Sequence, residues 1–185
     1  MSNRSLLWTA AAANALVAGS TYALEGWNRA SAHAAARNTA RLAGVCFLLA
    51  FAAPVMVRFV RRLPSQATLI LAFVAAQGVH FATVLVVLFV FDREHVAQNP
   101  LRAALVVTGG FGLVLAAALT AEPRTTRWYT VLRTLALSVI FVIFTGAFAF
   151  RHRGPLIVLA ILFLAALIAR IALWAKRPTR VAPAG

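Results

Sequence analysis

Long apolar runs, separated by short polar segments, dominate the chain. A transmembrane helix needs about 20 predominantly apolar residues, because an α-helix rises ~1.5 Å per residue and the hydrocarbon layer is ~30 Å thick. Six segments reach this length, at about residues 5–24, 40–60, 68–91, 101–121, 128–150 and 155–175. The pattern therefore predicts an all-α protein, a polytopic membrane bundle of six transmembrane helices that forms a single domain over residues 1–175.

The polar connections between these runs are all short. They read EGWNRASAHAAARN, RRLPSQ, DREHVAQNP, EPRTTR and RHRGP. We expect no folded domain outside the membrane, because no connection is long enough to form one. Several prolines (Pro64, Pro100, Pro123 and Pro155) fall at or near predicted helix starts, where a missing N–H costs little. The final segment, residues 176–185, is predicted to be a disordered basic tail.

Composition supports the membrane assignment. Hydrophobic residues make up 62% of the chain and charged residues 12%, whereas a soluble domain carries about 25% charged residues. The formal net charge is +14, and the basic residues flank the apolar runs. Anionic lipid headgroups are the expected counter-charge there, so we expect a lipid bilayer and no nucleic acid as the partner.

The distribution of basic residues gives a weak indication of orientation. Six spans place both termini on one side, whose nine basic residues are Arg4, Arg58, Arg61, Arg62, Arg124, Arg127, Lys176, Arg177 and Arg180. The seven on the other side are Arg29, Arg37, Arg41, Arg93, Arg102, Arg151 and Arg153. The positive-inside rule therefore favours cytoplasmic termini by a small margin.

Metal-binding and nucleophilic motifs are few. Cys46 is the single cysteine and lies inside an apolar run, so it can form neither an internal disulfide nor a cysteine-based metal site. His33, His95 and His152 fall in predicted connections beside arginines, and none pairs with another histidine at helical spacing. Solvated loop histidines are the expected outcome.

Polar side chains inside an apolar span are candidates for function, because they are costly to bury in lipid. The positions are Asn14, Gln77, His80, Arg133 and Arg170. Asn14 lies among alanines, and we expect it to hydrogen-bond to a neighbouring helix. Arg170 is near the end of its span and is expected to extend to the interface.

His80 lies deepest of these positions. It precedes Asp92 by about twelve residues, or ~18 Å along a helix, which is too far for an imidazole to reach water. Gln77 is three residues earlier and shares the same helix face. Two interpretations stay open: a neutral histidine hydrogen-bonded to another helix, or an axial ligand to haem iron.

The residues around His80 resemble the ferric reductase-like transmembrane domain family. In bacteria this family includes the haem-binding membrane subunit of the periplasmic methionine sulfoxide reductase system. The similarity rests on ARLAGVCFLLAFAAPVMVRF (40–59), the following Arg pair, and LILAFVAAQGVH (69–80). Matching positions are Pro54, Arg58, Leu69, Leu71 and His80, the last at the expected ligand position.

A second stretch, LTAEPRTTRWYTVLR (119–133), resembles the family's fifth helix and the loop before it. Tyr129 and Leu132 occupy the positions of the family's Trp and Leu, but Arg133 occupies that of a histidine. Arginine offers no lone pair, so it cannot ligate iron. Arg133 would instead pair with a haem propionate, an acid or a lipid phosphate, or would extend to the interface.

The resemblance implies one b-type haem between the third and fifth helices, with His80 on the iron and Gln77 and Arg133 beside the cofactor. The chain would then be at most an electron-relay subunit of an oxidoreductase in a bacterial inner membrane, with a separate redox partner protein. The alternative is a haem-free relative that acts as a membrane scaffold, a partner-binding subunit or a small-solute carrier. Asn14, Gln77 and His80 would then hydrogen-bond a neighbouring helix or a small neutral solute.

Overall fold

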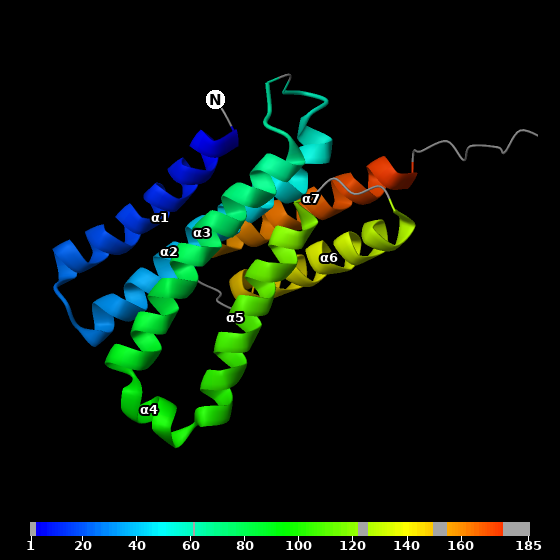
Figure 1. The fold of residues 1–185 in the computed structure, drawn as a ribbon. Coiled ribbons are helices and arrows are strands. Elements are labelled where there is room, and N and C mark those ends of the chain that lie inside the picture. Colours follow the sequence, from blue (N-terminus) through cyan, green and yellow to red (C-terminus); the bar gives the residue numbers. More distant parts are fainter. Residues whose placement is uncertain (1–2, 61, 122–125, 150–154, 176–185) are drawn as a thin grey trace, which may run out of the picture.

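The computed structural model describes residues 3–60, 62–121, 126–149 and 155–175, and the secondary structure in these ranges is helical (Figure 1). The all-α class is thereby confirmed for these residues. The elements are α1 (Asn3–Glu25), α2 (Arg29–Met56), α3 (Gln66–Val86), the π-helical turn η1 (Val87–Phe91), α4 (Arg93–Gln98), α5 (Pro100–Thr120), α6 (Arg127–Ala149) and α7 (Pro155–Ala175).

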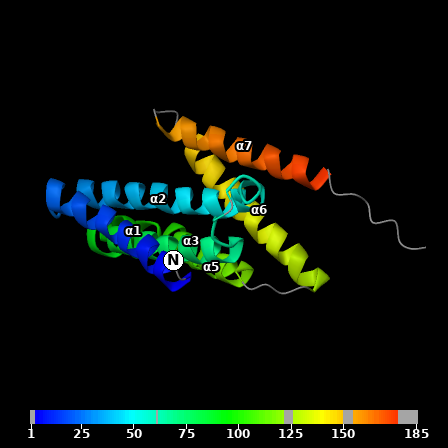
Figure 2. The same cartoon turned by 90° about the horizontal axis from the view of Figure 1, so that it is seen from above.

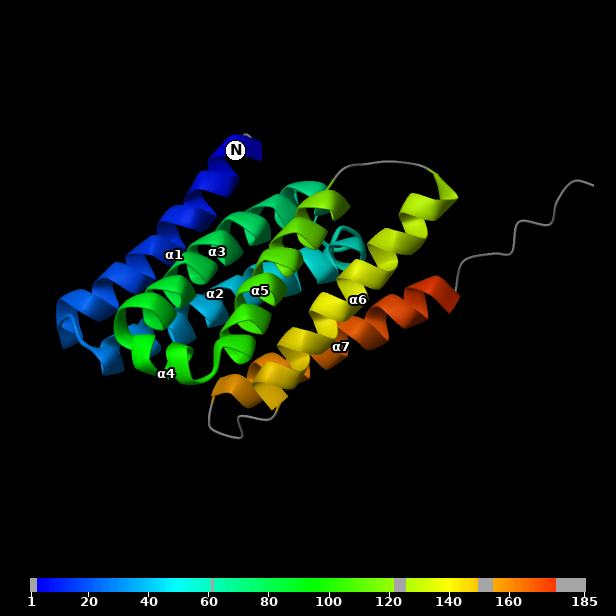
Figure 3. The same ribbon diagram turned by 60° about the horizontal axis from the view of Figure 1, so that its bottom comes forward.

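The six long helices alternate in direction along the bundle (Figures 1 and 3). We call the end that holds Met56, Gln66 and Thr120 the proximal end, and the end that holds Arg29 and Phe91 the distal end. Helix α2 lies between α7 on one side and α1 and α3 on the other (Figure 2). Helix α5 packs on α3, while α6 crosses the bundle obliquely and contacts α5 and α7 (Figure 2).

Helix α2 begins much earlier than its apolar run. The sequence predicted a connection through residue 38, but the helix starts at Arg29. Asn28 caps it: its side chain accepts from the Ser31 backbone N–H, and the Ser31 hydroxyl accepts from the Asn28 backbone N–H. The alanine-rich segment that follows has high helix propensity. His33 therefore lies in α2, and His95 lies in α4, so the prediction that both are loop residues was wrong.

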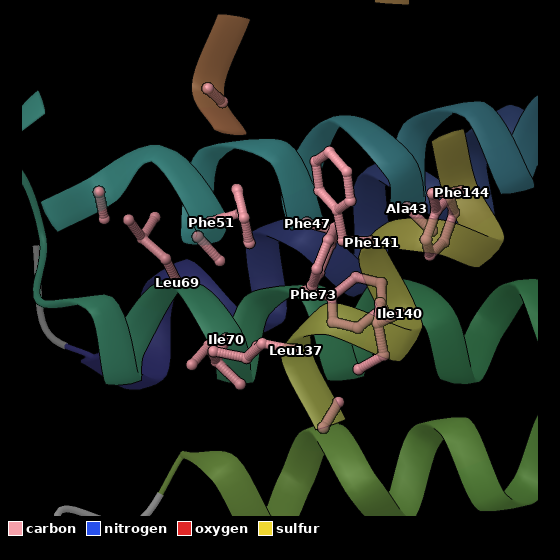
Figure 4. Packing of buried hydrophobic residues seen from close by; sticks show 14 of the residues in the cluster. Ala43, Phe47, Phe51, Leu69, Ile70, Phe73, Leu137, Ile140, Phe141 and Phe144 are labelled. Carbon is pink, nitrogen blue, oxygen red and sulfur yellow. The ribbon is translucent and has the colours of Figure 1, made fainter. Parts of the chain in front are cut away.

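An aromatic cluster forms the centre of the bundle (Figure 4). Phe47 of α2 is fully buried, and its ring centroid lies 5.1 to 6.1 Å from those of the neighbouring rings. These neighbours come from α2, α3, α6 and α7, and are Phe51, Phe73, Phe144 and Phe163. One side chain thus joins four helices that are far apart in sequence.

The outer surface of the bundle is apolar. Among the described residues, three helical stretches are long and apolar enough to cross a membrane: Arg29–Met56, Gln66–Phe91 and Ala103–Thr120. Val131–Gly146 and Ile157–Leu173 are shorter apolar helical stretches. Large side chains such as Leu16, Leu105 and Val142 are exposed on α1, α5 and α6. Lipid is the solvent that suits such a surface, and the chain is a helical membrane protein.

Candidate functional sites within and at the ends of the bundle

His80 contacts α2. Its Nδ1 lies 3.0 Å from Thr39 Oγ1, and the Thr39 hydroxyl is also 2.8 Å from the Ala35 carbonyl oxygen. A carbonyl only accepts, so the arrangement that satisfies both contacts has Thr39 donating to Ala35 and His80 Nδ1–H donating to Thr39. His80 is therefore hydrogen-bonded to another helix through Nδ1.

Asn14 and Gln77 add two amides at a similar depth. Asn14 is fully buried, and its Nδ2 donates to the Ala76 carbonyl oxygen of α3 at 2.5 Å, which confirms the expected interhelical bond. Gln77 is 7% exposed. Asn14 Oδ1 and Gln77 Oε1 have no hydrogen-bond partner among the described residues. Polar groups of α1, α2 and α3 therefore meet near the middle of the bundle.

Arg133 and Gln66 form a second contact, at the proximal end. Pro54 lies inside α2 and has no N–H, so the Ala50 carbonyl loses its usual helical donor. Gln66 Nε2 donates to this carbonyl at 3.2 Å, and Gln66 Oε1 accepts from Arg133 Nη2 at 2.9 Å. The Pro54 break thereby links α2, α3 and α6.

Arg170 of α7 approaches the same part of α2. It was expected to extend to the interface, but its guanidinium carbon lies 4.5 Å from the Phe51 ring centroid. Its Nη1 also donates to the Phe51 carbonyl oxygen at 3.3 Å. Arg170 therefore contacts α2 directly, whereas Arg133 is connected to α2 through Gln66.

The structure does not bring His80 and Arg133 together. Gln66, which holds Arg133, precedes His80 by fourteen residues, or about 21 Å along α3. The other described histidines, His33 and His95, lie at the distal end. Among the described residues, neither a second imidazole nor Arg133 therefore lies beside His80, where the resemblance would place a haem.

Two arginines on α2 lie at an unexpected depth. The Thr39–His80 contact fixes the level of α2 against α3, whose span Gln66–Phe91 is about 39 Å long. His80 is eleven residues, or about 17 Å, from Phe91. Arg41 then lies about 20 Å from the distal end of that span, close to its middle, and Arg37 about 14 Å from it.

Both arginines are exposed on the outside of the bundle. Together with Ala30 and Ala34 they follow helical spacing along one side of α2, which we call the arginine face. Helix α7 does not cover it, because its contacts with α2 fall on the later half of the helix (Figure 2). Arg41 Nη1 donates to Asn38 Oδ1 at 3.0 Å, and neither arginine forms an ion pair with a described residue. Sequence reasoning missed this face because it placed Arg37 in a loop.

A cavity of about 330 Å³ opens at the distal end. Asp92 Oδ1 lies 2.6 Å from Arg29 Nε, and its Oδ2 lies 3.0 Å from His33 Nε2. The turn η1 directly precedes Asp92, whose N–H donates to the Val87 carbonyl oxygen at 2.8 Å. Such π-helical turns are frequent at functional sites. His95 is the fourth ionisable residue that lines the cavity. Among the described residues, no group of three His, Cys, Asp or Glu side chains could hold a metal ion.

Some predictions fall outside the described residues. They concern His152, Pro123 and the tail at residues 176–185. Comparison of the chain with protein-family models, curated proteins and solved structures finds no match. Membership of the ferric reductase-like family stays a prediction from the sequence.

Proposed function

We propose that the chain is a haem-free, six-span membrane subunit that assembles with another membrane protein through the arginine face of α2. The single observation that carries this proposal is the exposure of Arg37 and Arg41 at mid-depth. Arginine inside a span almost always faces a bundle interior or a water-filled cavity, because leaving it in lipid is costly. A face that is exposed in the single chain is therefore an interior face of a larger assembly.

The chemistry of the partner follows from the charge of this face. A carboxylate on a neighbouring transmembrane helix would neutralise the guanidinium and accept paired N–H bonds from it. The described carboxylates, Glu25, Asp92 and Glu94, all lie at the distal end, so these groups of a second copy do not reach mid-depth. Ala30 and Ala34 allow a helix backbone to approach closely. The fitting partner is a different protein whose membrane helix carries Asp or Glu near its middle.

The same proposal places the protein in a bacterial inner membrane with cytoplasmic termini, in line with the small excess of basic residues on that side. The distal end then faces away from the cytoplasm. The cavity with Arg29, His33 and Asp92 would lie on that side, at the membrane surface.

Binding of a model transmembrane peptide tests the proposed assembly. In phosphatidylcholine vesicles, labelled protein is expected to bind a leucine-rich peptide with one central Glu about ten-fold more tightly than the same peptide with Gln, measured by energy transfer. Ten-fold corresponds to about 1.4 kcal/mol, the low end of measured couplings between close charged groups. The combined Arg37→Gln and Arg41→Gln variant is expected to bind both peptides equally.

Arg58→Gln is the matched control, because Arg58 is exposed in the connection at the proximal end. It should keep the preference for Glu. Equal binding of the two peptides by the unmodified protein would rule out the proposed assembly.

An optical spectrum separates this proposal from the haem relay. Protein produced with excess haem precursor is expected to show no Soret band. Arg133→His is expected to stay colourless as well, because residue 133 contacts Gln66 and not the region of His80. A Soret band in the unmodified protein that shifts on reduction and disappears in His80→Ala would instead establish the relay.

A further inference from the structure

The proximal end holds a second group of cations, independent of the arginine face. Arg133 donates to Gln66 Oε1, and Gln66 is oriented by its own bond to the Ala50 carbonyl. Because that carbonyl can only accept, the Gln66 amide must present Nε2 to α2 and Oε1 to Arg133. The neutral oxygen fixes the position of the guanidinium without neutralising its charge.

The depth of Arg133 is that of the lipid headgroups and the carbons next to them. It lies six residues, or about 9 Å, inside the start of α6 at Arg127. Trp128, next to that start, is 73% exposed, as expected for an aromatic side chain at the membrane interface. Gln66 is the first residue of α3, so the guanidinium it holds lies at the end of that span, at the level of the lipid phosphates.

The surroundings of Arg133 are positive. Arg58 and Arg62 are exposed in the connection at the same end. The described carboxylates lie at the distal end. The arrangement matches the requirement of a phosphate, which takes paired N–H donors from arginine.

We propose that Arg133, positioned by Gln66, binds the phosphate of an anionic phospholipid at the proximal end of α6. The lipid headgroup supplies the negative charge for Arg133, which forms no ion pair with a described residue. Gln66 is a positioning residue in this site: it holds the guanidinium and does not contact the lipid.

The test measures binding of phosphatidylglycerol to the purified full chain in detergent, by native mass spectrometry and by the shift in melting temperature. The unmodified protein is expected to bind phosphatidylglycerol more tightly than phosphatidylcholine. Arg133→Gln should weaken phosphatidylglycerol binding about five-fold, the factor expected for one basic side chain at an anionic surface. Arg58→Gln, in the exposed connection, should weaken it less than Arg133→Gln.

A second variant covers the case in which Arg133→Gln fails to fold. Gln66→Glu places a carboxylate on Arg133 but also removes the donor to the Ala50 carbonyl, so circular dichroism must first show that the helices are kept. In the folded variant, weaker phosphatidylglycerol binding is expected. Unchanged binding in both variants would overturn the proposal, and would be the result if Glu122, which lies outside the described residues, supplies the counter-charge. An equal stabilisation by inorganic phosphate would also overturn it, because the site would then take a free anion.

Discussion

Phe47→Ala is expected to lower the free energy of unfolding by about 3–5 kcal/mol, the usual range for truncating a buried aromatic side chain. Phe47 is fully buried, and its ring packs against phenylalanines of α3, α6 and α7. Interiors are close-packed, so the lost contacts are only partly recovered by relaxation. Because α6 and α7 pack on this ring, their attachment to α2 should weaken first.

The measurement is reversible unfolding in mixed micelles, followed by circular dichroism and by protease sensitivity of α6 and α7. Phe111→Ala is the matched control, because it removes the same side-chain atoms from a residue that is 62% exposed on α5. Its effect should stay within about 0.5 kcal/mol. Similar losses in the two variants would mean that Phe47 is not at the centre of the core.

Gly110→Ala is expected to destabilise the bundle by about 1–3 kcal/mol, the range for overpacking a close contact. A methyl group at this position would overlap the Phe81 ring of α3, with Cδ2 only 2.6 Å from the added carbon. Glycine at this point of α5 therefore allows the helix to approach α3. The loss should appear as separation of α5 from α3, measured by energy transfer between labels on the two helices.

Two neighbouring glycines provide controls for which the expected change in stability has the opposite sign. An added methyl group at Gly109 or Gly112 meets nothing within 4 Å. Alanine is favoured over glycine in a helix by up to about 1 kcal/mol, so Gly109→Ala and Gly112→Ala should be neutral or stabilising. If all three substitutions behaved alike, close packing at Gly110 could not be the reason for its small side chain.

Helix positions were largely predictable from the sequence, since length and apolarity decide which segments can enter a bilayer. The span predicted at about 5–24 became α1 (Asn3–Glu25), and that at 101–121 became α5 (Pro100–Thr120). The error at α2 has a physical cause. Apolarity marks the part of a helix that contacts lipid or core, whereas the start of α2 is fixed by the Asn28 cap and by alanines beside Arg29 and His33.

The contacts between helices could not be predicted in the same way. They depend on how each helix is rotated and how far it slides along its neighbours, and apolar helices of similar composition leave both undetermined. Asn14 was expected to bond to another helix, but nothing in the sequence chose the Ala76 carbonyl. Likewise, Arg133 stood out as an arginine in a span, while its partner Gln66 looked like an ordinary helix-start residue.

The hydrogen bond that Pro54 removes from α2 restricts which substitutions this sequence can accept during evolution. The amide at position 66 is needed because the proline leaves the Ala50 carbonyl without a donor inside α2. Once any other residue stands at position 54, its own N–H closes that bond and the constraint on position 66 disappears. In an alignment of divergent relatives, proline at 54 and a side-chain donor at 66 should therefore be gained and lost as a pair.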